Sequence, residues 1–174
     1  GKDASLGEKM IDIYSLIIYP IIYILPGYVA NGAPVLFGGG RPIDNGRKLS
    51  KNRIFGDNKT WRGLVAGLLA GALIGFGESF ALPFMLEIGI LEALGAHFGD
   101  LVGSFIKRRG GRSPGHKAGL MDQYLFVIFA ILFAAPLGNL PSIYGIVFIL
   151  VITGALHLFT NSVAHSWKLK SVPW

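Results

Sequence analysis

The sequence predicts an all-α integral membrane protein with five transmembrane helices, its N-terminus outside the cell and its C-terminus in the cytoplasm. Of the 174 residues, 52% are hydrophobic and 15% are charged, and the mean hydropathy is +0.54. A typical soluble domain is less apolar and more charged. Apolar windows near the ~20 residues that a spanning helix needs lie at about 13–37, 63–82, 83–106, 122–140 and 143–164. We expect residues 1–174 to form a single transmembrane domain.

The basic residues predict the orientation of these spans. Segment 38–62 holds seven Lys and Arg, loop 107–121 holds five, and Lys168 and Lys170 add two, so fourteen of the sixteen fall on one side. By the positive-inside rule this side is cytoplasmic. Basic loops also attract anionic head groups without doing any chemistry. That alternative does not explain the acidic residues Asp57, Asp100 and Asp122 among the cations.

The first window and the loop after it are rich in helix-breaking residues. Pro20 and Pro26-Gly27 remove helical hydrogen bonds and predict a bent first span. The following loop, 38–48, contains Gly38-Gly39-Gly40 and favours a backbone that a phosphate can approach closely. It lacks the P-loop pattern, so a flexible linker and a ligand-binding loop remain equally open.

Small residues mark one face of the second span. Gly67, Gly71 and Gly75 are four residues apart and therefore lie on one side of a helix. Such a stripe predicts close packing against another helix, either within the chain or across a dimer.

The third span carries ionisable residues in a segment otherwise suited to lipid. A carboxylate within a membrane span is costly and usually functional. Glu87 and Glu92 lie toward the outer side or at mid-depth, and we interpret them as neutral, hydrogen-bonded structural groups. The helical spacing places four polar residues on one stripe that leads to the cytoplasm: His97, Asp100, Ser104 and Lys107.

The fifth span has a second polar stripe. Thr153, His157 and Asn161 are spaced by four residues. An interhelical hydrogen bond explains His157 alone, whereas the whole stripe also suits a wall of the reaction cavity.

Two carboxylates at predicted cytoplasmic span ends suggest a metal-dependent reaction of phosphates. Asp100 and Asp122 flank a basic loop, and Mg²⁺ typically binds through one or two carboxylates together with substrate phosphates. Phosphoryl or nucleotidyl transfer needs anions to be aligned and neutralised, which cations and a metal supply.

The motifs together resemble the CTP-dependent lipid cytidylyltransferases, and within them the archaeal CDP-archaeol synthase branch. The resemblance covers most of the chain. It rests on Asn31-Gly32-Ala33-Pro34, Gly38-Gly39-Gly40-Arg41-Pro42-Ile43-Asp44, Phe55-Gly56-Asp57-Asn58-Lys59-Thr60-Trp61-Arg62-Gly63, Gly99-Asp100, Ser104-Phe105-Ile106-Lys107-Arg108-Arg109 and Asp122-Gln123.

The resemblance implies an enzyme that transfers CMP from CTP to 2,3-bis-O-(geranylgeranyl)-sn-glycerol 1-phosphate, giving CDP-archaeol and pyrophosphate. It also implies Mg²⁺ as cofactor, membrane lipids as surroundings and a multi-pass location in the cell membrane. A homodimer is compatible with it, and no nucleic-acid partner is expected. The implied roles are metal binding by Asp100 and Asp122, phosphate binding by Lys107 and Arg108, and nucleotide binding by Asn31, Pro42, Ile43, Asp44, Asp57, Lys59, Thr60 and Arg62.

Two other classes of protein fit parts of the sequence. Phosphotransferases that consume CDP-lipids carry an Asp-Gly-Ala-Arg style motif, which this chain lacks. An ion or proton transporter could use Glu87, Glu92, Asp100 and His157 as a relay. A proton or ion relay of this kind does not explain why the loops are rich in glycine and basic residues.

Overall fold

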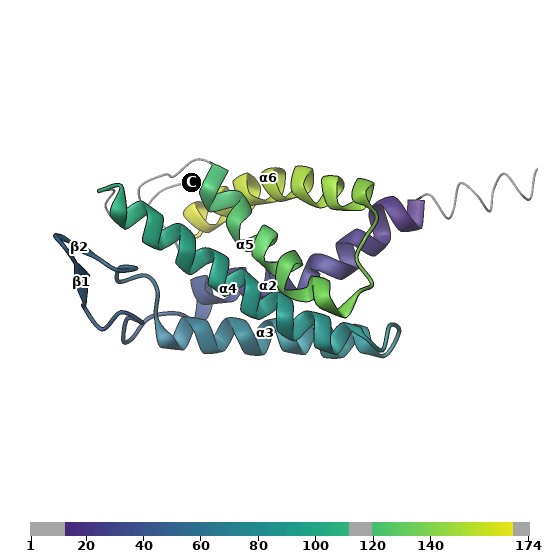
Figure 1. Ribbon diagram of the computed structural model, residues 1–174, viewed down its shortest axis with the longest axis horizontal. Coiled ribbons are helices and arrows are strands. Elements are labelled where there is room, and N and C mark those ends of the chain that lie inside the picture. The colour runs from purple at the N-terminus through teal and green to yellow at the C-terminus, as the bar shows by residue number, and fades with distance from the viewer. Residues whose placement is uncertain (1–12, 112–119, 169–174) are drawn as a thin grey trace, which may run out of the picture.

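The computed structural model describes residues 13–111 and 120–168. In this part of the chain a short π-helix, η1 (Tyr14–Ile18), leads into the first of five long helices (Figure 1). The five are α2 (Tyr19–Phe37), α3 (Trp61–Ser79), α4 (Met85–Arg109), α5 (Leu120–Ala134) and α6 (Ile143–Ser166). The smaller elements are the antiparallel strands β1 (Lys48–Leu49) and β2 (Asn52–Arg53) and the 3₁₀ turn η2 (Ala135–Leu137).

The five apolar windows coincide with the five long helices, with shifts of up to six residues at their ends. Helix α3 begins two residues earlier than predicted because Thr60 caps it, and α4 continues to Arg109, where cations suit the helix C-terminus. Among the described residues, one helical segment, Tyr14–Phe37, is long and apolar enough to cross a membrane by length and composition alone. Five membrane spans and their orientation therefore stay predictions.

The glycine stripe of α3 packs within the chain. A Cβ added at Gly71 would lie 2.7 Å from the Cβ of Ala93 on α4 and 3.1 Å from the Cβ of Ala30 on α2. A Cβ at Gly75 would lie 2.6 Å from the Met85 carbonyl oxygen. The predicted close packing is confirmed, and its partners are α2 and α4 of the same chain.

Glu92 joins α4 to the proline-containing part of α2. Its side chain is fully buried, and Oε2 accepts a hydrogen bond from the Gly27 N–H at 3.1 Å. Gly27 directly follows Pro26, where the helix lacks a backbone donor. The structure agrees with the interpretation of Glu92 as a hydrogen-bonded structural group. Glu87, which we interpreted in the same way, is exposed instead.

Helices α5 and α6 complete the bundle. The Tyr28 and Thr153 hydroxyls lie 2.7 Å apart and connect α2 to α6, while Thr153 also donates to the Ile149 carbonyl at 2.6 Å. Thr153 therefore serves as an interhelical hydrogen-bond partner. The side chains of His157 and Asn161 lie outside the described part of the structure.

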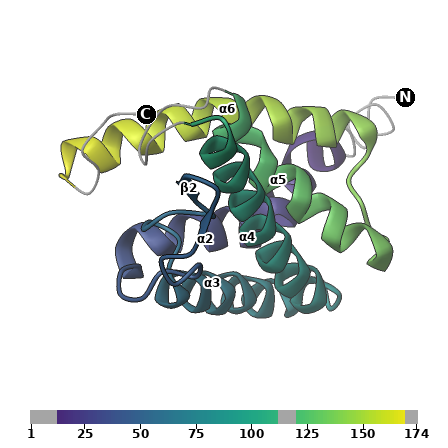
Figure 2. The same cartoon turned by 60° about the vertical axis from the view of Figure 1, so that its left-hand side comes forward.

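The basic segments gather at one end of the bundle. Figure 1 shows the β1–β2 hairpin beside the start of α3 and the end of α4, whereas the α3–α4 and α5–α6 connections lie at the opposite end. In Figure 2 the C-terminal half of α6 extends beyond the other helices on the left of the view. This arrangement brings the loop between α2 and α3 to the polar end of α4.

Candidate active site

Asp44 organises the loop between α2 and α3. Its side chain is fully buried, and its carboxylate accepts hydrogen bonds from the backbone N–H groups of Gly46, Phe55 and Gly56 at 3.0–3.1 Å. The Arg53 guanidinium donates two more, at 3.2 Å from Nε and 2.5 Å from Nη2. Gly46 and Gly56 have φ values of +81° and +102°, which other residues rarely adopt. The carboxylate thus joins both halves of the loop, and its contact with a nucleotide stays a prediction.

Replacing Asp44 should destabilise the loop in a pH-dependent way. Burial alone would raise the pKa of Asp44, but hydrogen bonds from Arg53 and from the loop amides hold that pKa well below its usual range. A lowered carboxyl pKa stabilises the fold above the unfolded-state pKa of about 4, and this contribution is lost as the pH falls toward the folded-state pKa. We expect Asp44→Asn to lower the thermal unfolding midpoint by about 5 °C at pH 7. The deficit should shrink as the pH falls below about 4.

Thermal unfolding in detergent at several pH values measures this effect. The matched control is Asp57→Asn, because Asp57 also accepts from Arg53, at 2.6 Å, but its side chain is 68% exposed. The control should change the midpoint little. An unchanged midpoint for Asp44→Asn at pH 7 would contradict the organising role.

The hairpin is fastened to the end of α4. Arg109 donates from its guanidinium to the carbonyl oxygens of Leu49 at 2.5 Å, Asn52 at 3.2 Å and Arg53 at 2.7 Å. The Asn52 side-chain amide donates to the Arg108 carbonyl at 2.9 Å. These contacts between distant segments fix the loop against α4.

Backbone contacts also fix the return of the loop to α3. Pro42 and Thr60 form an isolated bridge, and the Ile43 N–H donates to the Lys59 carbonyl at 2.7 Å. The Thr60 hydroxyl accepts from the Gly63 N–H at 3.1 Å and caps α3. Lys59 is therefore held directly before α3, with its side chain directed toward α4.

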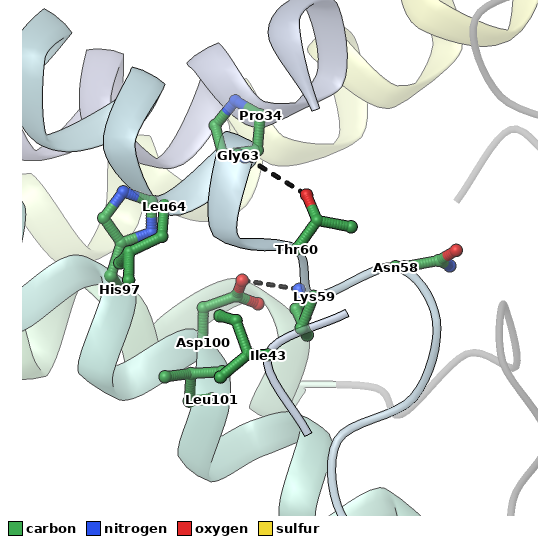
Figure 3. A pocket seen from close by; sticks show the side chains of 10 residues that line it. All are labelled: Pro34, Ile43, Asn58, Lys59, Thr60, Gly63, Leu64, His97, Asp100 and Leu101. Atoms are coloured by element: carbon green, nitrogen blue, oxygen red, sulfur yellow. Dashed lines mark hydrogen bonds and ion pairs between the residues drawn. The ribbon is translucent and has the colours of Figure 1, made fainter. Parts of the chain in front are cut away.

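Lys59 and Asp100 meet in a small open pocket between this loop and α4 (Figure 3). The Lys59 Nζ lies 2.5 Å from Asp100 Oδ2, and the two side chains are 24% and 34% exposed. A ligand can therefore reach both charges from solvent. The lining residues are Pro34, Ile43, Asn58, Lys59, Thr60, Gly63, Leu64, His97, Asp100 and Leu101.

The pocket contains part of the predicted site. Four predicted residues line it: Ile43, Lys59, Thr60 and Asp100. Of the others, Arg62 is exposed at the start of α3, and Asn31 is half-buried on α2 one turn before the lining residue Pro34. Pro42, Asp44 and Asp57 belong to the loop scaffold rather than to the lining.

The predicted phosphate-binding cations stand at the end of α4. Lys107 is close enough to Asp100 to interact with it electrostatically. Arg108 is buried, and its Nε would lie 3.6 Å from a Cβ added at Gly56 of the loop. Both residues are near the pocket without being part of its lining.

His97 is a lining residue that the sequence did not assign to the site. It is 7% exposed and lies one helical turn before Asp100. A Cβ at Gly67 would overlap its Nε2, so a glycine on α3 makes room for the ring. The helical stripe shared with Asp100 was the available signal for His97. Asn58 reaches the pocket through the path of its loop, and Leu101 lines it as the neighbour of Asp100 on α4.

The second predicted metal ligand lies on α5, whose side chains are described only from Gln123 onward. A Cβ at Gly95 would meet Phe129, and a Cβ at Gly99 would meet Leu125. The two helices are therefore antiparallel and in close backbone contact. One further turn of this register brings the helical turn that contains Asp122 opposite the turn of α4 that follows Asp100.

The donors at the pocket suit a metal that arrives with phosphates better than a preformed metal centre. Asp100 Oδ2 is paired with Lys59, and among the side chains that the structure describes no three from His, Asp and Glu cluster as ligands. Mg²⁺ commonly uses one or two carboxylates and completes its shell with substrate phosphates and water. The residues present therefore fit Mg²⁺ bound together with a nucleotide.

Similarity to known proteins identifies the family. The model of the CarS-like family, described as CDP-archaeol synthase, matches residues 13–174. The chain belongs to this family. The CDP-archaeol synthase of Pyrococcus furiosus is 45% identical over 168 residues, which cover 90% of this chain and 100% of that protein. The CDP-archaeol synthase of Methanopyrus kandleri is 44% identical over 156 residues, covering 87% of this chain and 90% of that protein.

A solved structure supports the same conclusion. It is described as an intramembrane enzyme for archaeal membrane lipids biosynthesis and has a TM-score of 0.76 at 38% identity, covering 81% of this chain and 91% of that chain. The predicted helical fold, membrane association and family are confirmed. As a member of the CDP-archaeol synthase family, the chain is a CTP-dependent lipid cytidylyltransferase, and the transporter alternative is not supported.

Proposed function

We propose that the pocket around Lys59 and Asp100 is where CMP is transferred from CTP to 2,3-bis-O-(geranylgeranyl)-sn-glycerol 1-phosphate. The products are CDP-archaeol and pyrophosphate. The observation that carries this assignment is the ion pair itself, a solvent-accessible ammonium and carboxylate 2.5 Å apart at the basic end of the bundle. In a chain of this family, the Lys59 ammonium can bind phosphates and the Asp100 carboxylate can bind a metal.

The reaction is an in-line displacement at phosphorus. A lipid phosphate oxygen forms a new bond to the α-phosphorus of CTP, the bond from that phosphorus to the bridging α–β oxygen breaks, and pyrophosphate leaves with the electron pair. No nucleophilic side chain is needed. Lys59, Lys107 and Arg108 would stabilise the negative charge that moves to pyrophosphate.

Mg²⁺ is the proposed cofactor, with Asp100 and Asp122 as its protein ligands. When bound, it offsets the repulsion between the two reacting anions. The approach of the α4 and α5 backbones supports this pairing, because it brings the turn that contains Asp122 opposite the turn of α4 that follows Asp100. Asn31, Pro42, Ile43, Asp44, Asp57, Thr60 and Arg62 complete the proposed nucleotide-binding segment.

The enzyme is proposed to be a multi-pass protein of the cell membrane with five spans. The hairpin end would face the cytoplasm, where CTP is available, and the N-terminus would lie outside. Lipid would reach the pocket from the surrounding bilayer. A homodimer would need a face other than the glycine stripe of α3, because α2 and α4 already cover that stripe.

Pyrophosphate release from CTP tests the proposed reaction. The purified protein should release pyrophosphate with Mg²⁺ and the diether lipid phosphate, and markedly less with a diester lipid phosphate. Omitting the lipid is the control and should abolish release. Release that is independent of lipid, or equal for the diether and diester substrates, would contradict the proposed acceptor.

A further inference from the structure

We propose that Lys59 is the resident counter-ion of Asp100 in the nucleotide-free enzyme, and that the arriving nucleotide draws Lys59 away so that a divalent metal can bind. Metal and nucleotide would then bind tightly only together. This inference rests on the proposed function, which makes Asp100 a metal ligand. It assigns Lys59 a second role, that of a positioning residue which controls access to the metal site.

The first observation is that the Lys59 ammonium is paired with the Asp100 carboxylate. Lys59 Nζ lies 2.5 Å from Asp100 Oδ2, so a divalent ion at that oxygen would meet the ammonium at close range. Mg²⁺ binds carboxylate oxygens at about 2.0–2.1 Å, so on this carboxylate it would lie only a few ångströms from the ammonium, and the two positive charges would repel each other. The metal and Lys59 must therefore compete for Asp100.

The second observation is that the pair can open at modest cost. The two side chains are 24% and 34% exposed, so water screens their attraction. Partly exposed ion pairs of this kind typically contribute little to stability. A ligand that offers Lys59 a more highly charged partner can therefore displace it from Asp100.

The third observation is that only the side chain of Lys59 needs to move. Its carbonyl accepts from the Ile43 N–H at 2.7 Å, and its own N–H donates to the Gly56 carbonyl at 3.3 Å. Thr60, the next residue, caps α3. The flexible four-carbon stem can thus redirect the ammonium while the loop remains in place.

A triphosphate is the partner that fits this exchange. Lys59 and Asp100 line the same pocket, so a nucleotide there would present phosphate oxygens to the ammonium as its metal reaches the carboxylate. The coupling must be reciprocal, because a metal that strengthens nucleotide binding is itself bound more tightly when the nucleotide is present.

Binding of Mn²⁺ without nucleotide, followed by electron paramagnetic resonance of the free ion, tests the counter-ion role. Mn²⁺ alone should bind Lys59→Gln up to about fivefold more tightly than the unmodified protein. The matched control is Lys51→Gln, which removes an exposed charge from the same loop and should leave the affinity unchanged. Lys59→Arg, which keeps the charge, should also bind Mn²⁺ as weakly as the unmodified protein.

A double variant assigns the gain to Asp100. Adding Asp100→Asn to Lys59→Gln should return Mn²⁺ affinity to the low value. Equal or weaker binding by Lys59→Gln, or a gain that survives Asp100→Asn, would overturn the proposal. If the unmodified protein still releases pyrophosphate from CTP in that case, the counter-ion role alone is wrong. Absence of both pyrophosphate release and CTP-dependent Mn²⁺ binding would instead overturn the proposed function.

Discussion

Asp100→Asn is expected to lower CTP turnover by at least about 100-fold while leaving the protein folded. Asparagine has nearly the same shape, and its amide oxygen can still accept the hydrogen bond that Lys59 donates to Asp100 Oδ2. The substitution removes the negative charge that the proposed metal site requires. Pyrophosphate release at saturating CTP and Mg²⁺ gives the turnover, and size-exclusion chromatography in detergent reports the folded state.

Glu87→Gln is the matched control for this variant. Glu87 also lies on α4, but it is exposed near the start of that helix, at the end opposite to the hairpin. Removing its charge should leave turnover close to that of the unmodified protein. Near-normal turnover of Asp100→Asn would exclude this carboxylate as an essential metal ligand.

Gly99→Ala is expected to cause a large loss of stability, about 3 kcal/mol or failure to fold. A Cβ at Gly99 would overlap the Leu125 carbonyl oxygen, and it would lie 2.8 Å from the Leu125 carbonyl carbon and 2.9 Å from the Phe126 Cα. These are backbone atoms of α5, so no side-chain rotation relieves the clash. Helices α4 and α5 would have to separate, and thermal unfolding in detergent measures the cost.

Gly77→Ala separates this clash from the general effect of placing alanine in a helix. Gly77 lies in α3, is exposed, and a Cβ there would meet no heavy atom within 4 Å. Because alanine is the better helix former, this variant should be unchanged or more stable by up to about 1 kcal/mol. Similar midpoints for Gly99→Ala and Gly77→Ala would mean that α4 and α5 do not pack as described.

The sequence predicted the helices well because a long apolar run leaves the backbone few alternatives to a helix. The ends were less accurate, since they depend on local capping such as the Thr60 hydroxyl on the Gly63 N–H. The glycine stripe of α3 predicted a close helix–helix contact but did not indicate which helix forms it. The partner helices are α2 and α4, whose small residues Ala30 and Ala93 face the stripe. This contact becomes visible only in the folded chain.

The sequence indicated candidate site residues one by one but not their arrangement. Asp100 was a candidate because a carboxylate in an apolar span is unusual. Lys59 was a candidate because it belongs to the motif at residues 55–63. Their pairing depends on the path of the loop, which Asp44 and Arg109 fix through contacts with distant backbone groups. An ion pair across 41 residues leaves no local pattern in a sequence. The same reason explains why Asp44, predicted as a nucleotide contact, forms the centre of the loop scaffold.

Calorimetric titration of CTP into the purified protein tests most directly whether Asp100 supports a joint metal and nucleotide site. With Mg²⁺ present, the unmodified protein should bind CTP at one saturable site, and chelation of the metal should weaken that binding strongly. Asp100→Asn should bind CTP weakly whether or not Mg²⁺ is present. Equal CTP affinity for the two proteins, or affinity that does not depend on Mg²⁺, would contradict the account.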